Sequence, residues 1–219
     1  MDVKQKIDLL YKLKKEVEKS SNALLVAQIN EIIKKVYEDK KIISFVGHFS
    51  SGKSSLINKL LDEDILPSSP VPTTSNSAQI TISEEEAIIV NLENHEYAVV
   101  SDYDTVKKIN TVNQRIESVE IKHRAPQLVN GLTLQDTPGI DATYSNHEEN
   151  TMKYLLTSDL IIYTVEYNHV ESEKNFKEMK RLNTLGVPLI LVVNQIDKHD
   201  EQEVTLDQFK SAIRSNIEL

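Results

Sequence analysis

The sequence predicts an α/β fold in which a mostly parallel sheet is flanked by helices. Apolar, β-branched runs of strand length alternate with segments whose apolar residues recur at helical spacing. Such an alternation is typical of parallel strands joined by right-handed helical crossovers. A glycine-rich motif at residues 46–55 stands between one such strand and one such helix. The chain has 219 residues, 39% of them hydrophobic, which is enough to bury the core of this fold.

The first 40 residues are expected to form a helical segment ahead of the main domain at 41–219. Apolar residues recur at three- and four-residue steps on both sides of residues 20–22 (Ser-Ser-Asn), which offer a break and an N-cap between two helices. The apolar stripe of such a helical pair must be buried against another surface. Two surfaces are equally compatible with the pattern: the flank of the main domain, or helices outside this chain.

Within the main domain, strands and helices are expected in alternation. The strands are expected at 41–46, 78–83, 87–90, 97–100, 119–121, 132–135, 160–165 and 187–193, with a hairpin between the third and the fourth. The helices are expected at 54–61, 102–114, 148–157, 171–185 and 206–217. A loop is expected at 62–77 because this stretch contains three prolines and many hydroxyl side chains.

The glycine-rich motif fits the phosphate-binding loop G-x-x-x-x-G-K-[ST]. Its two glycines permit backbone angles that turn successive N–H groups toward an anion, and the following helix adds the positive end of its dipole. Lys53 is expected to reach the β- and γ-phosphates, and the Ser54 hydroxyl is expected to bind Mg²⁺. The residues of this loop predicted to bind nucleotide are Gly47, Ser50, Ser51, Gly52, Lys53, Ser54 and Ser55.

Two later motifs complete a guanine-nucleotide site. Residues 136–139 (Asp-Thr-Pro-Gly) form a D-x-x-G motif, in which Asp136 is expected at the magnesium ion and the N–H of Gly139 at the γ-phosphate. Residues 194–197 (Asn-Gln-Ile-Asp) resemble the guanine-reading motif N-K-x-D, so Asn194, Gln195 and Asp197 are expected at the base. An aspartate there accepts two hydrogen bonds that adenine cannot supply. The order and spacing of the three motifs indicate a P-loop GTPase (G domain) that acts on GTP.

On these motifs the chain resembles the dynamin-like GTPases, most of all the bacterial dynamin-like proteins. The resemblance covers roughly residues 41–200, and its more specific marks are the doubled serine at 54–55 and the segments 65–67 (Ile-Leu-Pro) and 72–74 (Pro-Thr-Thr). It implies a role in membrane remodelling or fusion, driven by self-association of GTPase domains across the nucleotide. It also implies a cytoplasmic protein that is membrane-associated through regions outside this chain, with the first helices in a neck-like bundle.

The resemblance also implies catalytic roles. Ser50 inherits a suspected catalytic role beside Lys53, and Thr73, more than Thr74, would complete the magnesium shell of Ser54 and Asp136. The carbonyl of Thr73 would hold the attacking water. Three residues depart from related patterns: Phe49 replaces the phosphate-loop glutamine of eukaryotic dynamins, Gln195 replaces the lysine of the guanine motif, and Ile140 stands where Ras-type enzymes place a water-orienting glutamine.

Composition excludes several other functions. The net charge of −9 argues against nucleic acid as a main partner, and the absence of cysteine excludes thiol chemistry. The six histidines are scattered without metal-ligand spacing, so no zinc site is expected. His48 is interpreted as a surface polar residue, with a position at the face of a GTPase-domain dimer as the alternative. About twenty residues follow Asp197, so the last strand of a G domain and its base-lining loop are expected to be missing.

Two function classes are compatible with this sequence. The first is a mechanochemical enzyme whose GTP hydrolysis remodels membranes. The second is a slow GTP-dependent interaction switch without mechanochemical activity. Turnover that rises with protein concentration favours the first, whereas flat and slow turnover favours the second.

Overall fold

The structure is a computed structural model that describes residues 1–66, 77–92, 96–102, 105–106, 116–137, 139 and 155–217. Within these ranges the strands are β1 (Lys41–Val46), β2 (Ser77–Ile82), β3 (Ala87–Leu92), β4 (Tyr97–Val100), β5 (Ile116–His123), β6 (Leu132–Asp136), β7 (Leu160–Glu166) and β8 (Leu189–Asn194). The α-helices are α1 (Val3–Glu18), α2 (Ala23–Tyr37), α3 (Lys53–Leu61), α6 (Glu173–Asn183) and α7 (Leu206–Ile217). Two short 3-10 helices are η2 (Tyr167–His169) and η3 (Ile196–Lys198).

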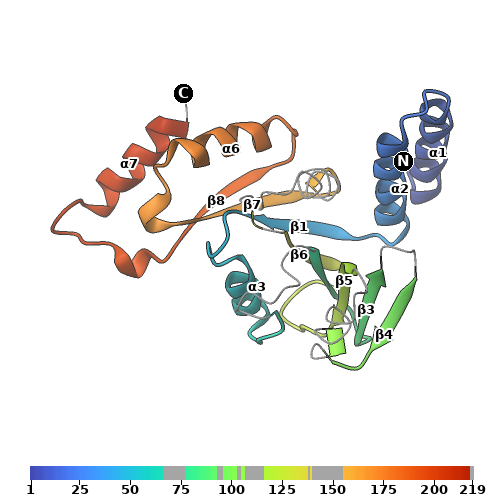
Figure 1. Cartoon of the computed structure of the whole chain (residues 1–219), viewed down its shortest axis with the longest axis horizontal. Helices are drawn as coiled ribbons and strands as arrows, with labels where there is room; N and C mark the ends of the chain where they lie inside the picture. Colours follow the sequence, from blue (N-terminus) through green and yellow to red (C-terminus); the bar gives the residue numbers. More distant parts are fainter. Residues whose placement is uncertain are drawn as a thin grey trace.

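The strands form one sheet with the order β4-β3-β5-β2-β6-β1-β7-β8 (Figure 1). Parallel pairing joins β6 to β1, β1 to β7, β7 to β8 and β2 to β5. Antiparallel pairing joins β2 to β6, β5 to β3 and β3 to β4. The mostly parallel α/β sheet predicted from the sequence is therefore confirmed, and so is the β3–β4 hairpin.

Helices cover both faces of the sheet near β1 (Figure 1). Phe45 points to one face, where it packs in an apolar cluster with Ile57 and Leu61 of α3. The next residue, Val46, belongs to a second cluster on the other face, with Leu182 of α6 and Ile213 of α7. Since side chains alternate along a strand, β1 joins the two clusters and lies at the centre of the fold.

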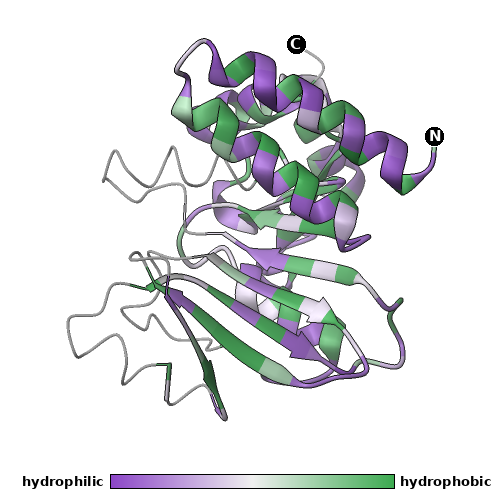
Figure 2. Cartoon of the chain, turned by 90° about the vertical axis from the view of Figure 1, so that its right-hand side faces the viewer, coloured by the Kyte–Doolittle hydropathy of each residue, from purple (hydrophilic) through white to green (hydrophobic). Residues whose placement is uncertain are grey.

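The first two helices form a hairpin that extends from one end of the sheet (Figures 1 and 2). Asp2 begins α1 with a capping box, and the Asn22 side chain caps α2 by accepting from the N–H of Leu25. None of the residues of α1, all of which the structure describes, is buried, and α2 buries only Ile29. The flank of the sheet therefore covers little of the apolar stripe on this hairpin.

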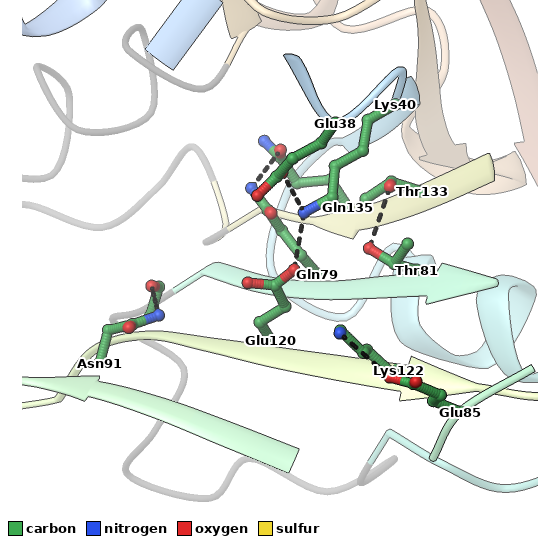
Figure 3. A network of polar contacts seen from close by, with 11 residues as sticks. Glu38, Lys40, Gln79, Thr81, Glu85, Asn91, Glu120, Lys122, Thr133 and Gln135 are labelled. Atoms are coloured by element: carbon green, nitrogen blue, oxygen red, sulfur yellow. Dashed lines mark hydrogen bonds and ion pairs between the residues drawn. The ribbon is translucent and has the colours of Figure 1, made fainter. Parts of the chain in front are cut away.

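Ion pairs of Lys35 on α2 and of Lys40, which directly precedes β1, lie where the helical hairpin meets the sheet. Lys35 Nζ lies 2.8 Å from Asp159 Oδ1, and Lys40 Nζ lies 2.6 Å from Glu120 Oε1 on β5 and 2.9 Å from Glu38 Oε2 at the end of α2 (Figure 3). Burial alone would lower the pKa of Lys40, but the hydrogen bonds and charges of Glu120 and Glu38 outweigh it and raise that pKa. Burial alone would raise the pKa of Glu120, but the hydrogen bond and the charge of Lys40 outweigh burial and lower that pKa.

Most predicted elements agree with the observed ones within a few residues. The predicted helix at 206–217 coincides with α7, whereas the short strand predicted at 119–121 is longer because β5 pairs with β2 and β3 on both sides. The predicted helices at 102–114 and 148–157 and the loop at 62–77 lie largely outside the described residues. Along the described ranges, no helix combines the length and the apolar character needed to cross a membrane.

Candidate nucleotide-binding site

The phosphate loop connects β1 to α3, and both of its glycines are required by close contacts. A Cβ atom at Gly47 would lie 2.1 Å from the carbonyl oxygen of Thr164 on β7. A Cβ atom at Gly52 would lie 2.0 Å from the Nδ2 atom of Asn194, and Gly52 has a φ of +89°. A side chain at Gly47 would clash with the backbone of β7, whereas one at Gly52 would displace the Asn194 amide and adopt an unfavourable positive φ.

Lys53 is buried at the first position of α3. Its ammonium group donates hydrogen bonds to the carbonyl oxygens of Gly47, at 3.1 Å, and His48, at 2.9 Å. The cation therefore lies along the inner side of the loop, where the dipole of α3 adds further positive potential. A phosphate group bound at this place would interact with both the Lys53 ammonium group and the positive end of the α3 dipole.

Ser54 and Asp136 meet at the start of α3. Ser54 Oγ donates to Asp136 Oδ2 at 2.5 Å, although the two residues are 82 positions apart in the chain. The other carboxylate oxygen, Oδ1, is buried and has no hydrogen-bond partner among the described residues. Burial raises the pKa of Asp136, an effect that the Ser54 hydrogen bond and the Lys53 charge partly offset. A hydroxyl and a carboxylate with a spare oxygen fit Mg²⁺, which prefers oxygen ligands.

The D-x-x-G segment lies against the phosphate loop. A Cβ atom at Gly139 would stand 2.9 Å from the backbone nitrogen of Phe49. The hydroxyl of Thr137 donates to the carbonyl oxygen of Phe45 at 2.8 Å, which ties the same segment to the end of β1. The Phe49 side chain itself remains 51% exposed at the rim of the loop.

The guanine motif reaches the phosphate loop through one side chain. Asn194 Nδ2 donates to the carbonyl oxygen of Ser51 at 3.0 Å, and its Oδ1 accepts from the N–H of Gln195 at 2.9 Å. Asp197 is exposed on η3. The ammonium group of Lys198 donates to Oε1 of Gln195. A positive charge therefore lies beside Gln195, the residue that replaces the usual lysine of the motif.

The remaining predicted residues lie at the edge of this assembly or outside the described ranges. Ser50 is exposed and has a φ of +63°, an unfavourable backbone angle for serine of the kind that clusters at functional sites. Ser55 is exposed on α3. Thr73, Thr74 and Ile140 lie outside the described residues.

Several contacts near the site have no counterpart in the sequence motifs. His48 is half-buried and lies 2.7 Å from Asn175 of α6, so its interpretation as a surface residue is wrong. Tyr167 contacts His199 just after the guanine motif, and Lys198 contacts Gln195. No spacing rule could have paired His48 with Asn175, because 127 positions separate them.

Comparisons with known proteins identify the family. The family model described as the dynamin family matches residues 43–197. Dynamin-like protein A of Bacillus subtilis is 33% identical over 215 residues, which cover 96% of this chain and 18% of that protein. Dynamin-like protein 2 of Campylobacter jejuni is 29% identical over 179 residues, covering 80% of this chain and 29% of that protein.

A solved structure agrees with these relatives. It is described as an oligomerised bacterial dynamin pair that provides a mechanism for sensing and tethering membranes at long range, and it matches with a TM-score of 0.62 and 25% identity. The match covers 99% of this chain and 40% of that chain, so this chain spans less than half the length of each of these proteins. The chain therefore belongs to the dynamin family, and the G domain that it carries is a dynamin-type GTPase domain.

Proposed function

We propose that this domain binds GTP with Mg²⁺ and hydrolyses it through self-association of two GTPase domains, in a protein that remodels or fuses membranes. The observation that carries the proposal is the convergence of the two later motifs on the phosphate loop. Ser54 contacts Asp136, Gly139 lies against Phe49, and Asn194 donates to Ser51. Each pair joins the phosphate loop to another strand end of the sheet, which is where nucleotides bind in folds of this class.

In the proposed reaction, a water molecule attacks the γ-phosphorus atom and the bond to the β–γ bridging oxygen breaks. Lys53 and the N–H groups of residues 50–55 would balance the charge on the phosphate oxygens. Ser54, Asp136 and Thr73 would hold Mg²⁺, which would supply further charge neutralisation. The carbonyl of Thr73 would orient the water, and Ser50 would act at the rim of the loop.

Guanine would be recognised by the loop that follows β8. Asp197 would accept hydrogen bonds from N1–H and N2–H₂ of the base, and its exposure on η3 leaves the carboxylate free to do so. Asn194 holds this loop against Ser51, so the base and the phosphates would be bound at a fixed separation. ATP would leave the carboxylate unsatisfied, which is how such sites reject the wrong base.

Self-association is supported by the residues at the rim of the loop. Phe49 is an exposed aromatic side chain and Ser50 is exposed beside it, so both are accessible to a second domain placed across the nucleotide. The relative of known structure is described as an oligomerised pair that tethers membranes. We infer that the present protein is cytoplasmic and associates with membranes through parts outside these 219 residues.

The rate of GTP hydrolysis per molecule tests the proposal when measured over a wide range of protein concentration, with and without liposomes. We expect a rate that rises with concentration, because paired domains would order Ser50 and the water. A slow rate that does not change with concentration would instead favour a GTP-dependent interaction switch. Phe49→Ala should remove the concentration dependence while leaving nucleotide affinity within about twofold, since its side chain lies at the rim.

A further inference from the structure

The connection between β7 and α6 contains η2 and lies between the two loops of the nucleotide site. At its α6 end, Asn175 is buried, with 1% of its surface exposed. Its Oδ1 accepts from Tyr163 Oη at 2.7 Å and lies 2.7 Å from His48 Nε2. Because an amide oxygen can only accept, His48 donates through Nε2. His48 is the residue whose carbonyl oxygen accepts from Lys53, so this contact anchors the phosphate loop.

The same amide also holds the connection itself. Asn175 Nδ2 donates to the carbonyl oxygen of His169, at the end of η2, at 2.6 Å. The hydroxyl of Ser172 accepts from the backbone N–H of Asn175 at 3.3 Å and caps α6. One buried side chain therefore links the phosphate loop, β7 and η2.

The other end of η2 contacts the guanine-reading loop. Tyr167 Oη and His199 Nδ1 lie 2.7 Å apart, and the two rings pack edge to face. Phe209 of α7 packs on the Tyr167 ring with centroids 4.7 Å apart. His199 directly follows η3, and its N–H donates to the carbonyl oxygen of Ile196, so its position is coupled to that of Asp197.

We propose that η2 acts as a strut, meaning a rigid link that holds the guanine-reading loop (residues 194–199) in a fixed position relative to the phosphate loop (residues 46–55). Tyr167 and His48 are the positioning residues of this strut. The hydrogen bond from Asn194 to Ser51 joins the same two loops directly, so the contacts form a closed ring. A closed ring of partly buried hydrogen bonds holds its members more rigidly than separate contacts would. The inference rests on the proposed binding of guanine nucleotide.

The strut makes a specific prediction about ligands. Tyr167→Phe keeps the ring that packs on Phe209 and removes only the hydroxyl. It should weaken GDP binding by about three- to tenfold, the loss expected for one hydrogen bond, and leave the affinity for tripolyphosphate unchanged. His48→Ala should weaken the binding of both ligands, because it frees the loop that holds the phosphates.

A double-mutant cycle tests the coupling. In the 219-residue chain, GDP and tripolyphosphate affinities are measured calorimetrically for the wild type, the two single variants and the double variant. The strut predicts that the double variant loses less GDP affinity than the product of the two single losses, because either change already breaks the ring. Losses that multiply, or a Tyr167→Phe variant that weakens both ligands equally or neither, would overturn the proposal.

Two controls separate this proposal from its alternatives. Thr81→Val also removes one buried hydroxyl, which contacts Thr133 within the sheet at 3.1 Å, and it should lower stability without changing either affinity.

Hydrogen exchange without nucleotide is the second control. Tyr167→Phe should speed exchange at the N–H groups of Lys198 and His199, which bond within the guanine-reading loop. A wild type that binds no GDP would refute the proposed function, and unchanged exchange would refute the strut.

Discussion

Lys53 is the side chain that we propose as the main cationic contact of the phosphates. Lys53→Ala should abolish GTP turnover and weaken GTP binding by roughly ten- to a hundredfold, the range expected for losing charge-assisted hydrogen bonds. Isothermal titration and phosphate release measure the two effects. Lys59→Ala removes an exposed lysine from the same helix and should change neither. Turnover in Lys53→Ala at the wild-type rate would contradict the assignment of the loop.

Asp197 is the residue that we propose to read guanine in preference to adenine. Asp197→Asn should lower the ratio of GTP to ATP affinity by about ten- to a hundredfold, because the carboxylate that accepts from the base is lost. Competition binding with a fluorescent nucleotide measures this ratio. The matched control is Asp207→Asn, an exposed position in the first turn of α7. A wild-type protein with equal affinity for the two nucleotides would show that Asp197 does not read the base.

Between elements, the Lys40–Glu120 ion pair joins the short connection from α2 to β1 to strand β5 (Figure 3). Both side chains are mostly buried, so Glu120→Gln leaves a buried ammonium whose remaining carboxylate partner among the described residues is Glu38. We expect a loss of about 3 kcal/mol in the free energy of unfolding at pH 7. Urea denaturation measures it. Glu85→Gln, in the exposed pair with Lys122, should cost less than about 1 kcal/mol.

The pH dependence of this pair follows from the direction of the pKa shifts. The pKa of Glu120 is lowered by Lys40 from its ordinary value of 4.5, so its stabilising effect is present above that pH and is lost as the pH falls through the lowered pKa. The raised pKa of Lys40 keeps that side chain charged throughout this range. The difference between the wild type and Glu120→Gln should therefore shrink below pH 4.5. A difference that stays constant on acidification would contradict the ion pair.

For the whole molecule, nucleotide binding should stabilise the fold, since the site joins β1, β6 and β8. GDP with Mg²⁺ at about one hundred times its dissociation constant should add about 2.7 kcal/mol and raise the melting temperature by roughly 5–10 °C. Differential scanning fluorimetry measures the shift. ATP at the same concentration should produce little change, and Asp136→Asn should remove the part of the shift that depends on Mg²⁺. Equal shifts with ATP and GDP would contradict a guanine-specific site.

The sequence by itself determined the features that are encoded in neighbouring residues. Helical and strand periodicity, the break at residues 20–22 and the phosphate-loop motif can each be recognised within about ten residues. The order of three short motifs was sufficient to predict a GTPase, and the family comparison confirmed it. These features depend on local backbone preferences, so they do not require knowledge of which strands pair.

Only the tertiary structure decided which residues meet. The antiparallel pairing of β2 with β6 and the contacts Ser54–Asp136 and His48–Asn175 join residues far apart in the chain. Asn194 and Ser51 are 143 positions apart, yet one hydrogen bond joins them. The physical reason is that such contacts depend on how the sheet and its helices pack as a whole. Local propensities indicate where an element lies but carry no information about its distant partner.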